Sequence, residues 1–102
     1  MLISTQNVNE IGVMPTVSFT SALQRFLPAP SAQVAGVTIG EALAAVFASH
    51  PRLRSYVLDD QGALRRHVAV YVNGRPIGDR IRLTDPLGPD DEVYVFQALS
   101  GG

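Results

Sequence analysis

Three residue types are missing from this chain of 102 residues, which has no cysteine, no tryptophan and no lysine. The absence of cysteine excludes disulfides, thiolate nucleophiles and the commoner zinc sites. Such a chain is compatible with a reducing compartment, and we expect a cytoplasmic protein. The absence of lysine means that no side chain can accept an isopeptide bond, which disfavours polymers linked through the chain's own side chains.

Charge and hydropathy exclude further classes. The eight basic residues are all arginine and lie scattered along a chain of net charge −1, whereas nucleic-acid-binding proteins usually concentrate basic residues on one face. No apolar run approaches the roughly 20 residues that span a bilayer, and no basic region followed by an apolar one opens the sequence. We therefore expect no nucleic-acid partner, no membrane segment and no export signal.

The sequence divides into three segments. Residues 1–13 are polar and without pattern, so we expect a loose N-terminal extension there. Residues 14–98 carry the regular patterns and are predicted to form one domain. Residues 99–102, Leu-Ser-Gly-Gly, are predicted to be a flexible tail. A domain of this size buries one modest core, which favours a binding or carrier module over a self-contained enzyme.

The first half of the domain predicts two strands and a helix. Val17 and Phe19 alternate with polar residues, which indicates a strand. A proline-rich loop follows, and a short second strand around 32–34, ending before a turn at Gly36, would complete a hairpin with the first. Within "TIGEALAAVFASH" Thr38 can cap a helix, and Glu41 can reach back to the amide of the cap. Pro51 is expected to end this helix at the preceding histidine and to lead into a turn or short extended piece.

The second half predicts three strands. "HVAVYV" alternates valines with other residues and ends at Asn73-Gly74, a dipeptide typical of tight hairpins. In "EVYVF", Val93 and Val95 would face one side of the sheet, and Tyr94 and Phe96 the other. The order strand–strand–helix–strand–strand–strand predicts an α+β fold, a mixed sheet of four to five strands covered on one face by one main helix.

The combination of "RRHVAVYVNGRPI", "LGPDDEVYVF" and the terminal "LSGG" resembles the ubiquitin-like β-grasp sulfur carriers of the MoaD and ThiS family. The resemblance covers most of residues 14–102. The long segment "HPRLRSYVLDDQGALRRHV" is more similar to the CysO-like branch of this family than to the shorter ThiS pattern. The first thirteen residues lie outside the family pattern.

The resemblance implies a carrier without catalytic residues or bound cofactor. An adenylating enzyme of the MoeB or ThiF type would use ATP to activate the carboxyl group of Gly102, which would then become a thiocarboxylate that donates sulfur. The implied acceptor is a pyridoxal-phosphate-dependent synthase that forms cysteine, with a metalloprotease that releases the product. Alternatives are the small subunit of molybdopterin synthase, a ubiquitin-like modifier joined through Gly102 to a lysine of another protein, and an interaction module with an idle tail.

The resemblance also assigns the partner-binding residues. Gly101 matches the penultimate glycine that allows the tail to pass into the partner, while Phe96 and Leu99 match apolar positions that dock on the activating enzyme. Fully extended, residues 99–102 reach roughly 13 Å, and glycine places no Cβ against a channel wall. Tyr94 would join Phe96 on the open face, and Arg66, Tyr71 and Arg75 are further candidates there. The alternative is that both aromatic residues are partly buried sheet residues without a partner.

The remaining polar residues have structural interpretations. His50 and His67 lie in different elements and in no ligand-spaced cluster, so we predict a helix-end histidine, a solvated strand histidine and no metal site. The pairs Asp59-Asp60 and Asp90-Asp91 occupy turn-like contexts, where aspartate accepts local backbone hydrogen bonds. No catalytic pair is predicted from them.

Overall fold

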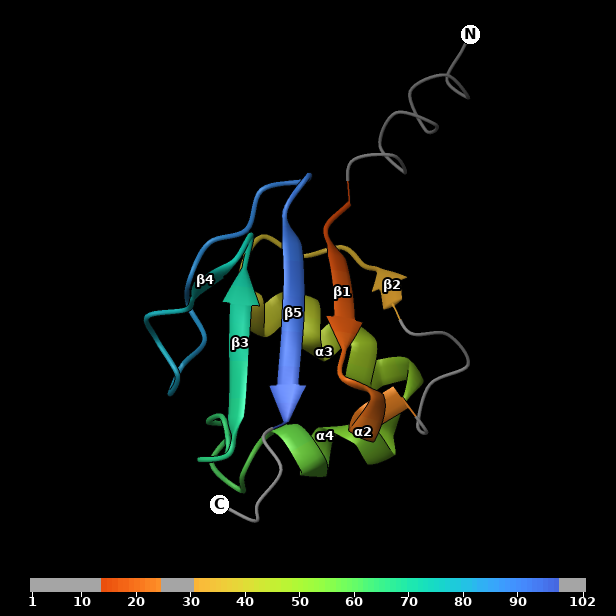
Figure 1. Ribbon diagram of the computed structural model, residues 1–102, viewed down its shortest axis with the longest axis vertical. Helices are drawn as coiled ribbons and strands as arrows, with labels where there is room; N and C mark the ends of the chain where they lie inside the picture. The colour runs from red at the N-terminus through yellow and green to blue at the C-terminus, as the bar shows by residue number, and fades with distance from the viewer. Residues whose placement is uncertain (1–13, 25–30, 98–102) are drawn as a thin grey trace, which may run out of the picture.

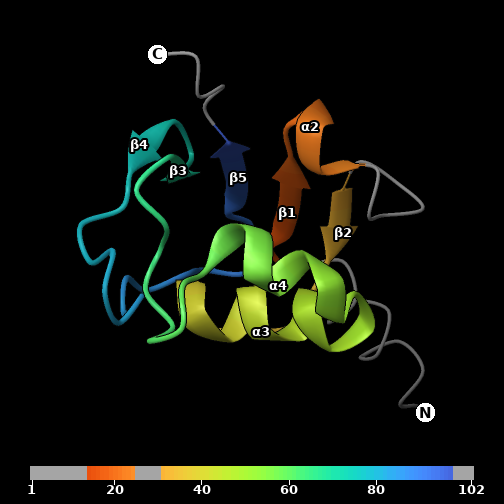
Figure 2. The same ribbon diagram turned by 90° about the horizontal axis from the view of Figure 1, so that it is seen from below.

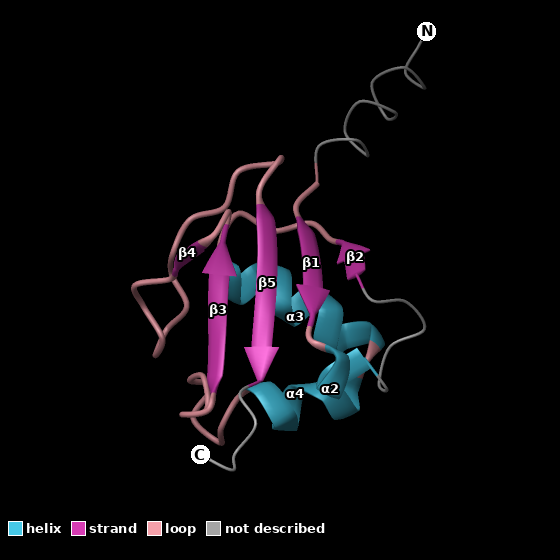
Figure 3. Ribbon diagram, viewed as in Figure 1, coloured by secondary structure: helices cyan, strands magenta, loops and turns pink. Residues whose placement is uncertain are grey.

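The computed structural model describes residues 14–24 and 31–97. The predicted N-terminal extension and the predicted tail lie outside the described residues. The elements follow one another as shown in Figure 3: β1 (Thr16–Phe19), α2 (Ser21–Gln24), β2 (Ser31–Gln33), α3 (Ile39–Ser49), α4 (Pro51–Val57), β3 (Val68–Val72), β4 (Arg75–Pro76) and β5 (Glu92–Gln97).

The strands form one mixed sheet in the order β2-β1-β5-β3-β4 (Figure 1). The pair β1–β5 is parallel, whereas β1–β2, β3–β4 and β3–β5 are antiparallel. This confirms the predicted mixed sheet, with five strands, the upper number expected. It also confirms the hairpin of the first two strands and the hairpin at residues 73–74. The last strand of the sequence is thereby the central strand of the sheet.

The helices α3 and α4 cover one face of this sheet (Figure 2), and no described helix covers the other. Alternation along the strands points every second side chain toward the helices, where apolar burial stabilises the fold. None of the helices within residues 14–24 and 31–97 is long and apolar enough to cross a bilayer. The core consists of side chains from the sheet, the helices and the loops between them: Val17, Phe19, Leu23, Ile39, Ala42, Leu43, Val46, Phe47, Leu53, Val57, Leu58, Leu64, Val68, Val70, Leu83, Leu87, Val93 and Val95.

The predicted helix is α3, and its start is capped from both sides. The hydroxyl of Thr38 accepts the amide N–H of Glu41 at 3.2 Å, as expected. The carboxylate of Glu41 accepts the N–H of Val37 at 3.0 Å, one residue before the amide that the sequence indicated. The helix ends at Ser49 with His50 as its C-cap, which confirms the predicted boundary.

The helix α4 was not expected, because Pro51 indicated a turn or an extended piece. Pro51 in fact begins a new helix, where its missing N–H has no helical partner to lose. Leu53 and Val57 lie four residues apart on one face and are both fully buried. The single turn α2, in a segment that the prolines marked as a loop, similarly buries Leu23.

The turn that joins β3 to β4 is tied to the beginning of β5. Asn73 and Gly74 have φ angles of 52° and 85°, the left-handed values that such a tight turn requires. The side chain of Asn73 donates to Asp91 Oδ1 at 2.8 Å and accepts the N–H of Glu92 at 2.9 Å. A hydrogen bond from the Gly88 amide, together with that from Asn73, lowers the pKa of Asp91. The structural reading of Asp91 is confirmed.

The loop from residue 78 to residue 85 is organised by two carboxylates. Asp79 accepts hydrogen bonds from the hydroxyl of Thr84 and from the amides of Ile81, Arg82 and Thr84. Asp85 accepts the two amides at the start of the loop, at 2.9 and 2.8 Å. The hydrogen bond from the Thr84 hydroxyl is the main reason why the pKa of Asp79 falls from 3.8 to about 2.

Asp79 is expected to make the fold sensitive to acid. Because its pKa is lower in the folded chain, the ionised carboxylate stabilises the fold above its unfolded pKa, and this contribution is lost as the pH falls from about 5 toward 2. We expect Asp79→Asn to lower the urea midpoint at pH 7 and to flatten its dependence on pH. The control Asp60→Asn removes an exposed carboxylate and should leave the profile unchanged; parallel profiles for Asp79→Asn and the parent would contradict this assignment.

Candidate partner-binding site

The open face of the sheet carries the aromatic residues that the sequence singled out. Val93 and Val95 are buried at 1% exposure or less, while Tyr94 and Phe96 are each 38% exposed. The predicted orientation of β5 is confirmed, and the use of Tyr94 and Phe96 in partner binding stays a prediction. Leu99, Gly101 and Gly102 lie outside the described residues.

Three rings on this face form an aromatic cluster, made of Tyr71, Tyr94 and Phe96. The ring of Phe96 lies at the centre, with its centroid 4.4 Å from that of Tyr94 and 5.4 Å from that of Tyr71. Both pairs are edge-to-face, at 90° and 80°, an arrangement that the quadrupoles of the rings favour. The cluster is therefore held in place by contacts among its own rings.

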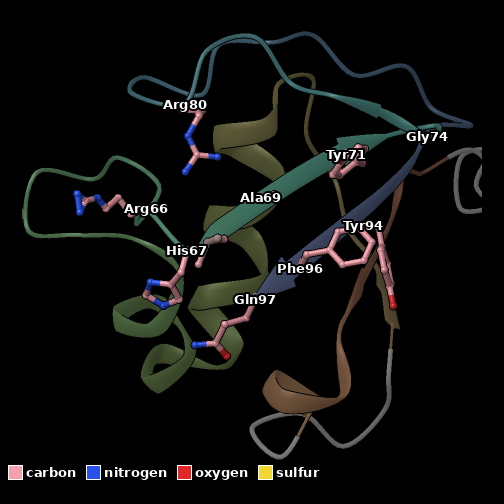
Figure 4. Close-up of a pocket in the computed structure, with 10 residues that line it drawn as sticks. Arg66, His67, Ala69, Tyr71, Gly74, Arg80, Tyr94, Phe96 and Gln97 are labelled. Atoms are coloured by element: carbon pink, nitrogen blue, oxygen red, sulfur yellow. The ribbon is translucent and has the colours of Figure 1, made fainter. Parts of the chain in front are cut away.

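A hollow of about 750 Å³ lies beside the aromatic cluster (Figure 4). Its position follows from strand register, because Ala69 of β3 lies directly opposite Phe96 of β5. The methyl group of Ala69 is too short to fill the space next to the large ring. The hollow is thus open to solvent on a face that no described helix covers.

Basic side chains border the same hollow. Arg66 and His67 precede β3 and are exposed, as the sequence indicated for the histidine. Arg80 comes from the loop of residues 78–85 and is held there because its guanidinium donates to the carbonyl of Arg65 at 2.8 Å. Figure 4 shows Arg66 and Arg80 on the side of β3 away from the rings of β5.

The sequence identified only part of this border. Arg66 and Tyr71 lie at the open face, as expected, and both line the hollow. The expectation that Arg75 shares this face was wrong, because Arg75 lies opposite Val72, which packs against the core, and it lines a different depression. His67 was missed as a member, although its alternation with Tyr71 would have placed both on one face. Arg80 was also missed, and no local pattern marks it.

The end of β5 is anchored at the edge of the hollow. Gln97, the last described residue, pairs with Val68 of β3, and its N–H donates to the hydroxyl of Thr20 at 3.3 Å. The N–H of Thr20 in turn donates to the carbonyl of Val95 at 3.0 Å. The segment after Gln97 therefore starts from a fixed point next to the aromatic cluster.

Among the described residues, no three His, Asp or Glu side chains gather closely enough to hold a metal ion. His50 lies between α3 and α4, and His67 lies in the turn directly before β3. The carboxylates of Asp79 and Asp91 accept hydrogen bonds from their own loops. What the open face offers is an exposed surface of aromatic and basic side chains.

Comparison with known proteins gives matches over most of the chain. The model of the ThiS family matches residues 26–102. Small archaeal modifier protein 1 of Haloferax volcanii is 37% identical over 65 residues, which are 64% of this chain and 70% of that protein. A crystal structure of the same archaeal protein has a TM-score of 0.75 at 28% identity and covers 86% of this chain and 98% of its own.

A second solved structure matches equally well in shape. A chain in the crystal structure of the Amycolatopsis orientalis BexX/CysO complex has a TM-score of 0.76 at 24% identity, with 86% of this chain and 99% of that chain covered. At this identity the likeness concerns the fold alone. The structural matches agree on a β-grasp fold with the strand and helix arrangement described above.

Proposed function

This chain belongs to the ThiS family of ubiquitin-like β-grasp proteins, and from that premise we propose that it carries sulfur as a thiocarboxylate on Gly102. Its relatives are small modifier and sulfur-carrier proteins rather than enzymes. The observation that carries the proposal is the match of the family model through residues 101–102, on a chain whose central strand ends beside an exposed aromatic cluster.

The proposed chemistry takes place in a partner enzyme. The carboxylate of Gly102 attacks the α-phosphorus of ATP, pyrophosphate leaves, and an acyl adenylate forms. A sulfur donor of the hydrosulfide class then attacks the acyl carbon, AMP leaves, and one proton is released. The products are the thiocarboxylate and AMP, and the chain itself acts as a co-substrate of an adenylating enzyme of the MoeB or ThiF type.

The folded body supports this chemistry by docking. Ordering a glycine-rich tail in a narrow channel costs on the order of 1–2 kcal/mol per residue, so contacts elsewhere must offset that cost. Tyr94 and Phe96 are exposed aromatic residues of the kind that dominate interfaces, and Leu99 follows them within a few residues. In this proposal they hold the body on the enzyme while Gly101 and Gly102 enter the channel.

The resemblance of residues 50–68 to the CysO-like branch favours cysteine as the product. The sulfur acceptor in this proposal is a pyridoxal-phosphate-dependent synthase, and a metalloprotease releases the cysteine from the carrier. The small subunit of molybdopterin synthase is the alternative carrier role, since it uses the same terminal chemistry with a different acceptor.

A second candidate function is protein modification. It is favoured by the 37% identity to small archaeal modifier protein 1. In this case a lysine amine of another protein attacks the acyl carbon of the Gly102 adenylate, AMP leaves, one proton is released, and an isopeptide bond forms. The absence of lysine from this chain restricts it to single attachments rather than to polymers through its side chains.

Intact-protein mass spectrometry separates the two functions. For the chain purified from its native host we expect a gain of about 16 Da, since sulfur replaces one oxygen, and no gain in a variant that lacks Gly102. Attachment to larger proteins that depends on Gly102 would favour the modifier. An unmodified mass without Gly102-dependent attachment to other proteins, both from the host and after incubation with ATP, sulfide and the host's adenylating enzyme, would reject both functions.

A further inference from the structure

The open face of the sheet is polarised in charge. Glu92 begins β5 on this face, four residues before Phe96, a separation of about 13 Å at 3.3 Å per residue. Arg66, His67 and Arg80 border the hollow near the other end of the strand. No acidic side chain of the described ranges lines the hollow, so the two arginines there are not balanced by a carboxylate in its lining.

Both arginines have N–H groups that make no hydrogen bond within the described residues. Arg66 is exposed, and within the described residues its side chain has no hydrogen-bond or ion-pair partner. Arg80 uses its guanidinium for one hydrogen bond, to the carbonyl of Arg65, which fixes the group and leaves its other N–H donors free. A planar guanidinium matches the two oxygens of a carboxylate, and one that is already fixed loses less entropy on binding.

The rings that line the same hollow favour an apolar side chain over a nucleobase. Successive bases stack on a flat aromatic platform, but the ring of Phe96 lies perpendicular or nearly so to both neighbouring rings, so the three rings share no common plane. The space above Ala69 is instead a concave apolar surface next to a partly exposed ring. A side chain such as leucine or phenylalanine would bury apolar area there without disturbing the cluster.

We infer that this hollow receives a segment of a partner protein in which an apolar side chain is flanked by carboxylates. The apolar side chain lies against Phe96 and Ala69, and the carboxylates pair with Arg66 and Arg80. That the partner is the adenylating enzyme rests on the proposed function, whereas the chemistry of the docking segment rests on this face alone. Arg66 and Arg80 are thus determinants of partner choice.

The test uses two peptides of equal apolar content, N-acetyl-Glu-Leu-Phe-Glu-amide and its neutral counterpart with glutamine in place of glutamate. Each is titrated into the ¹⁵N-labelled full-length chain and followed by NMR. We expect the acidic peptide to shift the amide signals of His67, Ala69 and Phe96 and to bind about fivefold more tightly than the neutral one. In about 1 M salt, where screening is strong, the preference should vanish.

Substitutions identify the groups responsible. Arg66→Gln and Arg80→Gln are each expected to lower the preference for the acidic peptide, and the double variant to abolish it. The control is Arg52→Gln, on the exposed surface of α4. It changes the net charge by the same amount as each single variant and should retain the preference for the acidic peptide. The amide spectrum of each variant shows that the fold is intact, which matters most for Arg80 because of its hydrogen bond.

Several results would overturn the inference. These are equal binding of both peptides, a preference that survives in the double variant, a stronger response to the oligonucleotide rU6, or concentration-dependent shifts that place a second copy of the chain on this face. A Gly102 mass gain with equal peptide binding would reject this inference alone. A clear acidic preference without any modification at Gly102 would reject the proposed function alone.

Discussion

Replacement of Phe96 by alanine is expected to lower kcat/KM for adenylation of this chain by about 30-fold, which corresponds to a loss of about 2 kcal/mol of binding energy. Phe96 is the central ring of the aromatic cluster and contacts both tyrosines. Its removal therefore takes away the ring itself and the support for its neighbours. Because docking acts equally on the ground state and the transition state, KM should rise while kcat stays close to that of the parent.

The measurement is pyrophosphate release by the adenylating enzyme over a range of carrier concentrations. The matched control is Val37→Ala, because Val37 is an apolar residue that is 65% exposed and lies in the segment before α3 rather than on the open face. We expect the control to behave like the parent. If Phe96→Ala stayed within twofold of the parent, the aromatic cluster would not be the docking surface of the proposed function.

Replacement of Gly36 by alanine is expected to destabilise the fold by about 3 kcal/mol, the upper end of the usual cost of overpacking. A Cβ at position 36 would lie 2.7 Å from the backbone nitrogen of Ala42 and 3.0 Å from its Cα. These are backbone atoms of the first turn of α3, which cannot rotate out of the way as a side chain would. The segment after β2 must move off the helix, or the helix must shift on the sheet.

Thermal unfolding measures this effect, and a fall in Tm of about 12 °C or more is expected for a domain of this size. Gly88→Ala is the control, because its new Cβ would meet only the carboxylate of Asp91, at an ordinary contact distance of 3.7 Å. It should change Tm little. Equal Tm values for the two variants would show that the segment around Gly36 yields without cost.

The strands of this fold could be predicted because the residues that determine each strand are neighbours in the sequence. Which side of a sheet a residue faces depends on its position along the strand, so the valines of "EVYVF" place Tyr94 and Phe96 on the opposite face without knowledge of any neighbour. The turn at Asn73-Gly74 and the cap at Thr38 depend equally on a few adjacent residues. The sequence therefore predicted those parts of the candidate docking surface that lie on strands, namely Tyr71, Tyr94 and Phe96.

The remaining features depend on contacts between distant residues or on two opposing local effects. Pro51 both ends one helix and can begin another, and burial of Leu53 and Val57 decides between these outcomes. Arg80 reaches the open face only through its hydrogen bond to the carbonyl of Arg65. Gly36 indicated a turn, yet its role is close approach to the backbone of α3. None of these contacts leaves a periodic pattern in the sequence.

The parallel pairing of β1 with β5 imposes an order on the folding of a newly synthesised chain. Thr16 pairs with Glu92, so β1 waits for a neighbour that is synthesised 76 residues later (92 − 16). Before β5 is available, the sheet consists of two separate pairs of strands, β1–β2 and β3–β4, and isolated pairs of this kind are marginally stable in water. The sheet closes only once residues 92–97 are present, because β5 pairs with both β1 and β3. A nascent chain that lacks β5 therefore holds its two strand pairs apart, with the apolar side chains of β1 and β3 still exposed to water.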